Sequence, residues 1–262
     1  MIILMVGDMV GGPGRKIFAR IAGRMKQQGQ VDMIVANAEN SAGGKGASRI
    51  IAGELFDAGA DVLTMGDHMW DQKDIIPYLE VEKRIIRPAN FAPGCPGRGV
   101  VTVETPKGRV TVISLIGRVF MPPMDCPFRT VDALLSKEPN MGKVILVDFH
   151  AEATSEKLAM GRHLDGRVSA VVGTHTHVQT SDEIIMPKKT AYLTDLGMTG
   201  PKDSIIGRDY VSVMGRFITG MPSKFEIAEG NVALEGALID VDETTGRARK
   251  ITRVREFLDH HK

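Results

Sequence analysis

The chain alternates short apolar runs with loops that are polar or rich in glycine. Five of these runs have the length of a buried β-strand, and each is followed directly by a loop with acidic, amide or imidazole side chains. Helical patterns lie between several of the runs, and strands that alternate with helices indicate a parallel α/β core. The five predicted strands are Ile2–Val6, Met33–Ala36, Val62–Met65, Val144–Val147 and Ala170–Val172.

Two of the helical patterns begin beside a residue that can cap a helix. Ser48 precedes a pattern whose apolar face includes Leu55 and which stops near Gly59. Thr154 stands before a second pattern that runs through Met160. We therefore predict that Ser48 and Thr154 are N-caps.

Other segments depart from this alternation. Val100–Glu104 and Val110–Leu115 flank a Pro-Lys-Gly turn, which predicts an antiparallel hairpin. The stretch after residue 192 is largely β in pattern and includes Val232–Val241 and Lys250–Val254. A mixed, layered α/β sandwich accommodates both kinds of segment. Because no repeat or linker interrupts the 262 residues, we expect one domain over residues 1–262.

The charge balance excludes bulk attraction to nucleic acid or anionic lipid. Lys and Arg together number 33 and Asp and Glu 32, so the formal net charge is +1. Hydrophobic residues make up 43% and charged residues 25%, which excludes a disordered, coiled-coil or collagen-like chain. A charged ligand must therefore be bound at a local site.

Cysteine usage and hydropathy indicate the cellular compartment of the protein. Cys95 and Cys126 each stand beside a proline without a CxxC spacing, which disfavours a disulfide framework and a thiolate zinc site. The N-terminal run Met1–Val6 has no basic segment before it, and no apolar stretch approaches the ~18 residues that a membrane span requires. We expect a reduced, cytoplasmic protein that does not bind membranes.

Polar side chains fall at or just beyond the C-terminal ends of the five predicted strands. In open α/β sheets this edge binds ligands, because the loops converge there while the strands hold them rigidly. We therefore expect one rim that gathers oxygen and nitrogen donors from five segments. These residues are Asp8, Glu39, Asn40, Asp67, His68, His150, His175 and His177.

This mixture of donors favours a metal centre. Imidazole and carboxylate groups together suit iron, manganese, zinc or cobalt better than calcium or soft copper. Seven candidate ligands, with His68 left aside, exceed one tetrahedral site but fill two adjacent sites if one carboxylate bridges them. Two cations roughly 3.5–4 Å apart can hold a phosphoryl group and activate water, so the residues predict a dinuclear hydrolase.

Taken singly, several of these residues have a simpler explanation. Asp8 is compatible with a turn or cap, and His150 with a satisfied histidine at a strand end. His175 and His177 flank one residue and face the same way on an extended segment, which is a stronger metal signal. Other histidines are not at strand ends and are predicted to play no part, namely His163, His260 and His261.

The glycine-rich loops do not match a nucleotide-binding motif. Neither the loop around Gly12 nor the loop around Gly44 has the spacing GxGxxG or GxxxxGK[ST]. We interpret these glycines as residues that permit tight backbone near the metals.

Six segments together resemble the YmdB-like branch of the calcineurin-like metallophosphoesterases. They are GDMVGGPGR, NAENSAGG, GDHMWD, VDFHAEATSEK, GTHTHVQT and TDLGMTGPKDSIIG, and the resemblance runs from Met1 to about Asp240. It implies a four-layered α/β/β/α sandwich with two metal ions at the sheet edge, with iron expected before manganese or zinc. It also implies hydrolysis of phosphodiesters, and specifically of 2′,3′-cyclic nucleotides such as 2′,3′-cAMP.

Matched position by position, the resemblance implies a role for each candidate residue. One metal is held by Asp8, Glu39, Asn40 and His177, and the other by Glu39, Asp67, His150 and His175, with Glu39 bridging. His68 corresponds to a histidine that does not ligate metal but lies beside the phosphate. We expect hydroxide held between the metals to attack phosphorus in line, and His68 to protonate the departing ribose oxygen.

The sequence departs from the family pattern at two positions. Val10 stands where many superfamily members have the histidine of a DxH motif, and we expect Asn40 to supply the missing donor. Asp67 stands where the motif GNHxWD has asparagine. Aspartate keeps a ligating oxygen but adds negative charge to a pocket that must admit phosphate.

Two alternatives to a cyclic-nucleotide phosphodiesterase remain open. One is a regulatory or scaffold protein that keeps the metal site but has weak activity. The other is a phosphodiesterase that acts on short RNA or DNA, bound by a local basic patch. The residues of the patch are Arg15, Lys16, Lys45 and Arg49.

A homo-oligomer is also compatible with the sequence.

Overall fold

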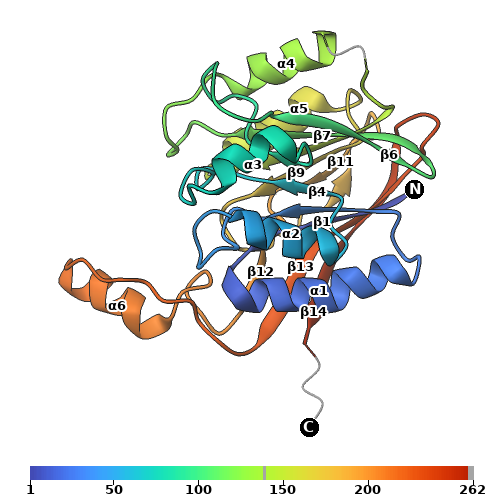
Figure 1. The fold of residues 1–262 in the computed structure, drawn as a ribbon. Helices are drawn as coiled ribbons and strands as arrows, with labels where there is room; N and C mark the ends of the chain where they lie inside the picture. Colours follow the sequence, from blue (N-terminus) through green and yellow to red (C-terminus); the bar gives the residue numbers. More distant parts are fainter. Residues whose placement is uncertain (138–139, 259–262) are drawn as a thin grey trace.

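Two mixed β-sheets pack face to face, and helices cover their outer surfaces, in the computed structural model (Figure 1). The structure describes residues 1–137 and 140–258. The layers follow the order helices, first sheet, second sheet, helices. This confirms the α/β/β/α sandwich that the resemblance implied.

The first sheet has a parallel centre and an antiparallel margin. Strands β1, β3, β4 and β5 run parallel to one another, whereas β13 pairs antiparallel with β1, β12 and β14. The strand order is β2 (Asp8–Met9), β12 (Met198–Pro201), β13 (Val232–Val241), β1 (Ile2–Val6), β3 (Met33–Asn37), β4 (Val62–Thr64) and β5 (Ile85–Ile86), with β14 (Ala248–Phe257) also on β13.

The second sheet is built in the same way. Strands β7, β8, β9 and β11 are parallel, and a hairpin strand closes each side. The predicted hairpin is confirmed, since β6 and β7 pair from Val100↔Ile113 to Thr105↔Gly108. The order is β10 (Ile184–Ile185), β11 (Ala191–Leu193), β9 (Ala170–Thr174), β8 (Val144–His150), β7 (Gly108–Ile116) and β6 (Val100–Thr105).

Three apolar cores hold the layers together. Alternate residues of β1 face opposite ways: Ile3 and Met5 lie in the core between the sheets, and Leu4 lies in the core under the helices. A strand that is buried on both faces is apolar throughout, which explains why the central strands read as continuous apolar runs. The covering helices are α1 (Gly11–Gln27), α2 (Arg49–Asp57) and α3 (Ile75–Val81) on the first sheet, and α4 (Pro127–Lys137) and α5 (Thr154–Leu164) on the second.

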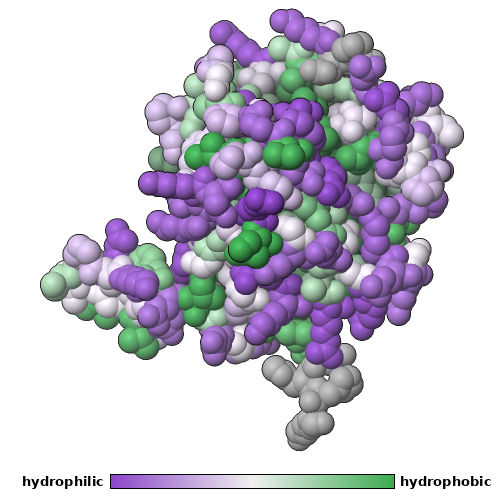
Figure 2. Space-filling view, viewed as in Figure 1, coloured by the Kyte–Doolittle hydropathy of each residue, from purple (hydrophilic) through white to green (hydrophobic). Residues whose placement is uncertain are grey.

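One helix lies outside this sandwich. The helix α6 (Tyr210–Thr219) projects from the body on the segment between β12 and β13 (Figure 1). Figure 2 shows hydrophobic side chains on this projecting segment, and Val211, Phe217 and Ile218 are each at least 70% exposed. The expectation of a single domain stays a prediction.

The predicted strands and one of the two predicted caps are confirmed. All five apolar runs form strands, and β8 and β9 extend beyond the predicted ends to His150 and Thr174. Ser48 caps α2, because its side chain accepts the backbone N–H of Ile51 at 3.2 Å. The prediction for Thr154 is wrong: Thr154 is the first residue of α5, and the cap position is Ala153, which has no side-chain acceptor.

No helix within the described residues is both long enough and apolar enough to cross a membrane.

Replacement of the Ser48 cap tests this local account. Ser48→Ala removes the acceptor for an N–H at the start of α2, so we expect the free energy of unfolding to fall by about 1 kcal/mol. Thr154→Ala is the matched control and should change the free energy of unfolding by less than about 0.5 kcal/mol, since Thr154 makes no capping hydrogen bond. Denaturant unfolding measures both, and equal losses would contradict the assignment.

Candidate metal centre

Both sheets end at the same edge of the sandwich, and the candidate residues lie there. Asp8 follows β1, Glu39 and Asn40 follow β3, and Asp67 follows β4 in the first sheet. In the second sheet His150 ends β8, and His175 follows β9. Sequence reasoning expected the rim of one open sheet, whereas two facing sheets supply the donors.

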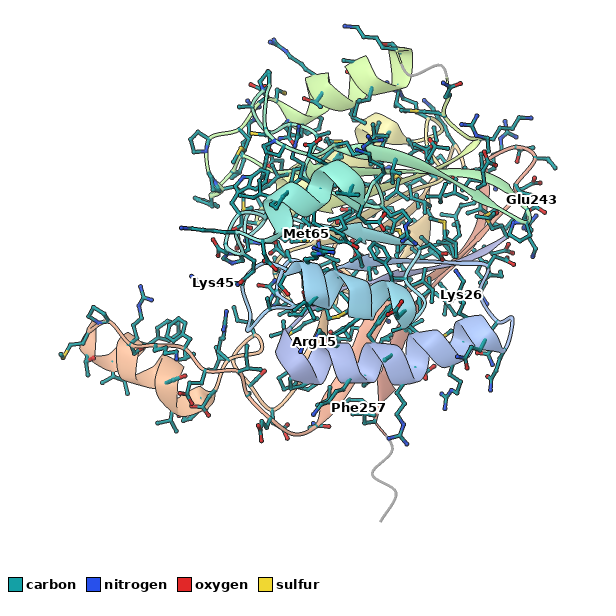
Figure 3. All side chains as sticks on the ribbon, in the orientation of Figure 1. Arg15, Lys26, Lys45, Met65, Glu243 and Phe257 are labelled. Carbon is teal, nitrogen blue, oxygen red and sulfur yellow. The ribbon has the colours of Figure 1, made fainter. Side chains whose placement is uncertain are left out.

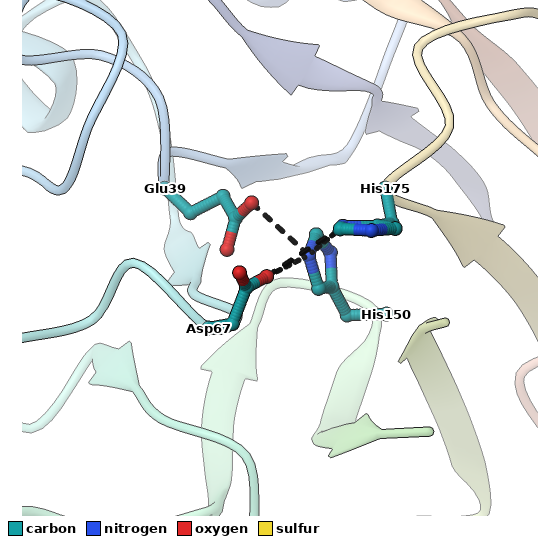
Figure 4. Close-up of side chains that lie close together, drawn as sticks. All are labelled: Glu39, Asp67, His150 and His175. Carbon is teal, nitrogen blue, oxygen red and sulfur yellow. Dashed lines mark hydrogen bonds and ion pairs between the residues drawn. The ribbon is translucent and has the colours of Figure 1, made fainter. Parts of the chain in front are cut away.

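Four side chains form a tight cluster at this edge (Figure 4). One ligand atom from each of Glu39, Asp67, His150 and His175 lies within 4.8 Å of the others, an arrangement that could hold a metal ion. Nε2 of His150 is 3.0 Å from Glu39 Oε1 and 3.1 Å from Asp67 Oδ1. Nδ1 of His175 lies 2.9 Å from the same His150 nitrogen. The donors therefore converge on one point.

The remaining three candidates adjoin this cluster. Nδ2 of Asn40 is 3.2 Å from Glu39 Oε1 and 3.3 Å from His177 Nε2. Oδ1 of Asp8 is 3.8 Å from both His177 Nε2 and His150 Nδ1. All seven residues are thus brought together. For Asn40 to bind a cation through its oxygen, its amide has to turn over.

Unpartnered oxygens show that the pocket fits cations. Asp8 and Glu39 are completely buried, yet Asp8 Oδ1 and Glu39 Oε2 have no hydrogen-bond partner within the described part of the chain. A buried carboxylate oxygen without a partner is strongly unfavourable, so each indicates a missing positive group. The oxygen and imidazole donors are those that iron, manganese or zinc prefer.

The ionisation of these groups reflects the same deficit of positive charge. Burial raises the pKa of Asp8 well above its usual value. Burial alone would lower the pKa of His150, but the charge of Glu39 and the hydrogen bonds that His150 donates to Asp67 and Glu39 raise it well above the usual range. A protonated His150 thus compensates the carboxylates, and cation binding would displace that proton.

The other two histidines are neutral donors. Burial lowers the pKa of His175 to about 4, and the neighbouring charge of His150 acts in the same direction. Burial also lowers the pKa of His177. The Nδ1–H group of His177 faces the carbonyl oxygen of Ile206 at 3.0 Å, which leaves Nε2 as the unprotonated atom toward Asn40.

The sequence argument assumed that the segment carrying His175 and His177 is extended, and the structure shows that it is not. Both residues have positive φ, at +102° and +64°. Such strain persists only where surrounding contacts fix it. The N–H of His175 donates to Asp8 Oδ2 at 3.0 Å, and Thr176 donates to Asp195, which pairs with the buried Lys157 at 2.7 Å.

Behind His150 lies a buried polar network that sequence reasoning missed. Nδ1 of His150 lies 2.9 Å from Thr174 Oγ1, and that hydroxyl donates to Asp148 at 2.7 Å. The hydroxyl accepts the Nδ1–H of His150, so Nε2 is the nitrogen that would lose its proton and face a bound cation. Asp148 precedes His150 by two residues on one strand, and this spacing was the available signal.

His68 lies at the mouth of the centre and outside the four-residue cluster. Its Nδ1 is 3.0 Å from Asp71 Oδ2, which orients the ring. His68 lines a cleft of about 320 Å³ above the candidate ligands. Sequence reasoning missed three further lining residues from other segments, which are Glu152, Ile206 and Arg208.

Two glycines make room for side chains at this site. A Cβ on Gly66 would lie 2.0 Å from Glu39 Oε2 and 2.5 Å from His150 Nε2. A Cβ on Gly44 would lie 2.3 Å from the guanidinium of Arg208, which donates to the Gly44 carbonyl at 2.5 Å. The expectation of tight backbone near the metals was made for the loops around Gly12 and Gly44. Nothing lies within 4 Å of a Cβ at Gly12, and Gly44 makes room for Arg208, whereas Gly66, which that expectation did not include, is the glycine that adjoins the cluster.

Three histidines were predicted to play no part in the site, and the basic patch was a separate hypothesis. His163 belongs to α5 and contacts Asp132 at 2.9 Å, and His260 and His261 lie outside the described residues. In the basic patch, Arg15 at the start of α1 pairs with Glu54 at 3.2 Å, whereas Lys45 lies at the outer edge of the molecule (Figure 3).

Comparison with known proteins adds independent findings. The family described as YmdB-like protein matches residues 4–254. A 2′,3′-cyclic-nucleotide 2′-phosphodiesterase from Bacillus subtilis (strain 168) is 46% identical over 260 residues, covering 99% of this chain and 98% of that protein.

Two solved structures have nearly the same fold. A protein from Thermus thermophilus, described as hypothetical, has a TM-score of 0.93 and 39% identity, with 98% of this chain and 99% of that chain covered. A structure described as a novel phosphatase from Mycoplasma pneumoniae has a TM-score of 0.91 and 34% identity, with 98% and 93% covered.

A substitution at Gly66 tests whether the cluster needs the space that this glycine leaves. Gly66→Ala would push Glu39 and His150 out of the cluster, so we expect metal affinity to fall about 10- to 100-fold, as when the supports of metal ligands are altered. Metal titration followed by elemental analysis measures this. Gly53→Ala in α2 is the control, because nothing lies within 4 Å of its Cβ position. Unchanged affinity in Gly66→Ala would contradict the placement of the cation.

Proposed function

The chain belongs to the YmdB-like protein family, and from this we propose that it is a metal-dependent phosphodiesterase that hydrolyses 2′,3′-cyclic nucleotides. The observation that carries the proposal is the convergence of carboxylates and imidazoles on one point below an open cleft. The 46% identity to a 2′,3′-cyclic-nucleotide 2′-phosphodiesterase, over nearly the full length of both chains, supports the substrate class.

Seven side chains of this protein would hold two metal ions, iron before manganese or zinc. Asp8, Asn40 and His177 serve one ion, Asp67, His150 and His175 serve the other, and Glu39 reaches both. Its two oxygens support this role, since Oε1 faces His150 at 3.0 Å and Oε2 has no partner among the described residues. When bound, two such ions supply charge stabilisation at the phosphoryl group and activation of water.

His68 would act as the general acid. Asp71 accepts the Nδ1–H of the ring at 3.0 Å, so Nε2 is the nitrogen left for a substrate in the cleft. Proton donation from Nε2 to the ribose O2′ as its bond to phosphorus breaks gives a 3′-nucleotide. The cleft of about 320 Å³ lies in the range of small-molecule sites, which suits a mononucleotide better than a nucleic-acid strand.

Turnover by metal-loaded protein tests the proposal. We expect hydrolysis of 2′,3′-cAMP to 3′-AMP that stops on chelation and returns on addition of iron, manganese or zinc. Faster cleavage of short RNA or DNA would instead favour a nuclease. Two metal ions bound without any turnover would favour a regulatory metal protein.

Removal of the proposed acid separates catalysis from metal binding. We expect His68→Ala to retain both metals and to lose about 10²- to 10⁴-fold in kcat, the range for general acid catalysis. Glu39→Gln is the converse variant and should lose metal, because a charged bridging oxygen is removed. Elemental analysis beside kinetics distinguishes the two, and a fully active His68→Ala enzyme would remove the acid role.

Asp67 offers a gain-of-function test. Asp67→Asn keeps a side-chain oxygen 3.1 Å from His150 but removes a negative charge beside an anionic substrate. We expect kcat to rise severalfold with the metal content unchanged. Glu152→Gln is a control for general charge removal, since Glu152 lines the same cleft but is not a proposed ligand. Lower turnover of Asp67→Asn at equal metal loading would refute the argument.

A further inference from the structure

The loop that follows β7 begins beside the candidate metal centre. The last residue of β7, Ile116, pairs with His150, and the N–H of Gly117 donates to the His150 carbonyl at 2.9 Å. The loop then runs from residue 117 to α4. It therefore leaves the sheet at the edge where the cluster lies.

Buried side chains clamp this loop at both ends. The amide of Asn90 donates to the carbonyls of Ile116 at 2.8 Å and Asp125 at 2.9 Å, and its oxygen accepts the N–H of Ile116. The carboxylate of Glu156 accepts the N–H groups of Arg118 at 3.0 Å and Val119 at 3.2 Å. The loop is thus held rigidly up to residue 119.

The same short segment connects the loop to the cleft. Glu152 lines the cleft and lies 3.3 Å from His175, and Glu156 comes four residues later. Beyond the tip of the loop, Met121 packs against the core under the helices of the first sheet. Because Phe120 is only three residues beyond Gly117, the tip of the loop lies at most about 11 Å along the chain from the point where Gly117 bonds to His150.

Phe120 is displayed at this tip. Its side chain is 88% exposed, the highest value among the exposed large hydrophobic residues, and its φ is +60°. A bulky residue in the left-handed region is strained, and an exposed phenyl ring gains nothing from the core to offset that strain. Its rigid presentation suits the binding of a flat ligand.

We propose that Phe120 stacks on the base of the nucleotide and so determines specificity for nucleotides over other cyclic phosphodiesters. This rests on the proposed function. With the phosphodiester at the metal cluster, the base at the far side of the ribose has to leave the cleft at its rim. Stacking on an aromatic ring accepts any base because every base presents a π-face, and purines stack most strongly.

The test compares substrates with and without a base. We expect Phe120→Ala to raise KM for 2′,3′-cAMP about tenfold, with kcat little changed, and to leave kcat/KM for glycerol 1,2-cyclic phosphate unaltered. Phe120→Trp should restore the wild-type KM. Phe217→Ala on α6 is the matched control, because Phe217 is also a phenylalanine and is 70% exposed.

Equilibrium binding makes the inference independent of turnover. Calorimetry with 3′-AMP should show weaker binding to Phe120→Ala and unchanged binding to Phe217→Ala. If wild-type protein hydrolyses 2′,3′-cAMP and both variants match it in KM, the role of Phe120 is refuted while the proposed function stands. If the wild-type protein has no turnover but binds 3′-AMP more tightly than Phe120→Ala does, the base site stands and the proposed function fails. If Phe120→Ala affects both substrates equally, stacking on the base is refuted.

Discussion

The structure depends on carboxylates that are buried where two sheets meet. Asp8 and Glu39 are almost without solvent contact, and each has an oxygen with no partner in the described part of the chain. Desolvation of charged oxygens is tolerated only when positive charge compensates it. In this protein that charge is a protonated His150 or bound cations, so folding of the edge and occupation of the site are coupled.

The two-sheet architecture is what makes such a site available. A single parallel sheet presents one row of strand ends, whereas here the ends of β3 and β4 face those of β8 and β9 across the inner core. Each sheet supplies donors that the other lacks: carboxylates come from the first sheet and imidazoles from the second. This arrangement brings Nε2 of His150 within 3.1 Å of Glu39 and Asp67, so groups of opposite charge face each other where the two sheets meet.

Much of this arrangement could be predicted from the sequence, because the apolar runs end where the donors begin. Strand burial on both faces and the position of His150 follow from local pattern. Local sequence pattern does not show which distant segments fold back to the site. Ile206 and Arg208 reach the cleft from the segment that leads to α6, and Glu156 holds a loop nearly forty residues earlier in the chain. The cap at Thr154 failed for a related reason, since α5 begins one residue earlier than the cap signal required.

Asp67 sets the charge of the site, and the consequence follows from formal charges. The group carries three carboxylates, those of Asp8, Glu39 and Asp67. Two divalent ions, as proposed above, would leave the site at +1, whereas asparagine at position 67 would leave it at +2. A cyclic phosphodiester carries one negative charge, and more negative charge develops on the phosphoryl oxygens as water adds to phosphorus. Aspartate at position 67 weakens the attraction of the site for both, which is why its replacement by asparagine is expected to raise kcat.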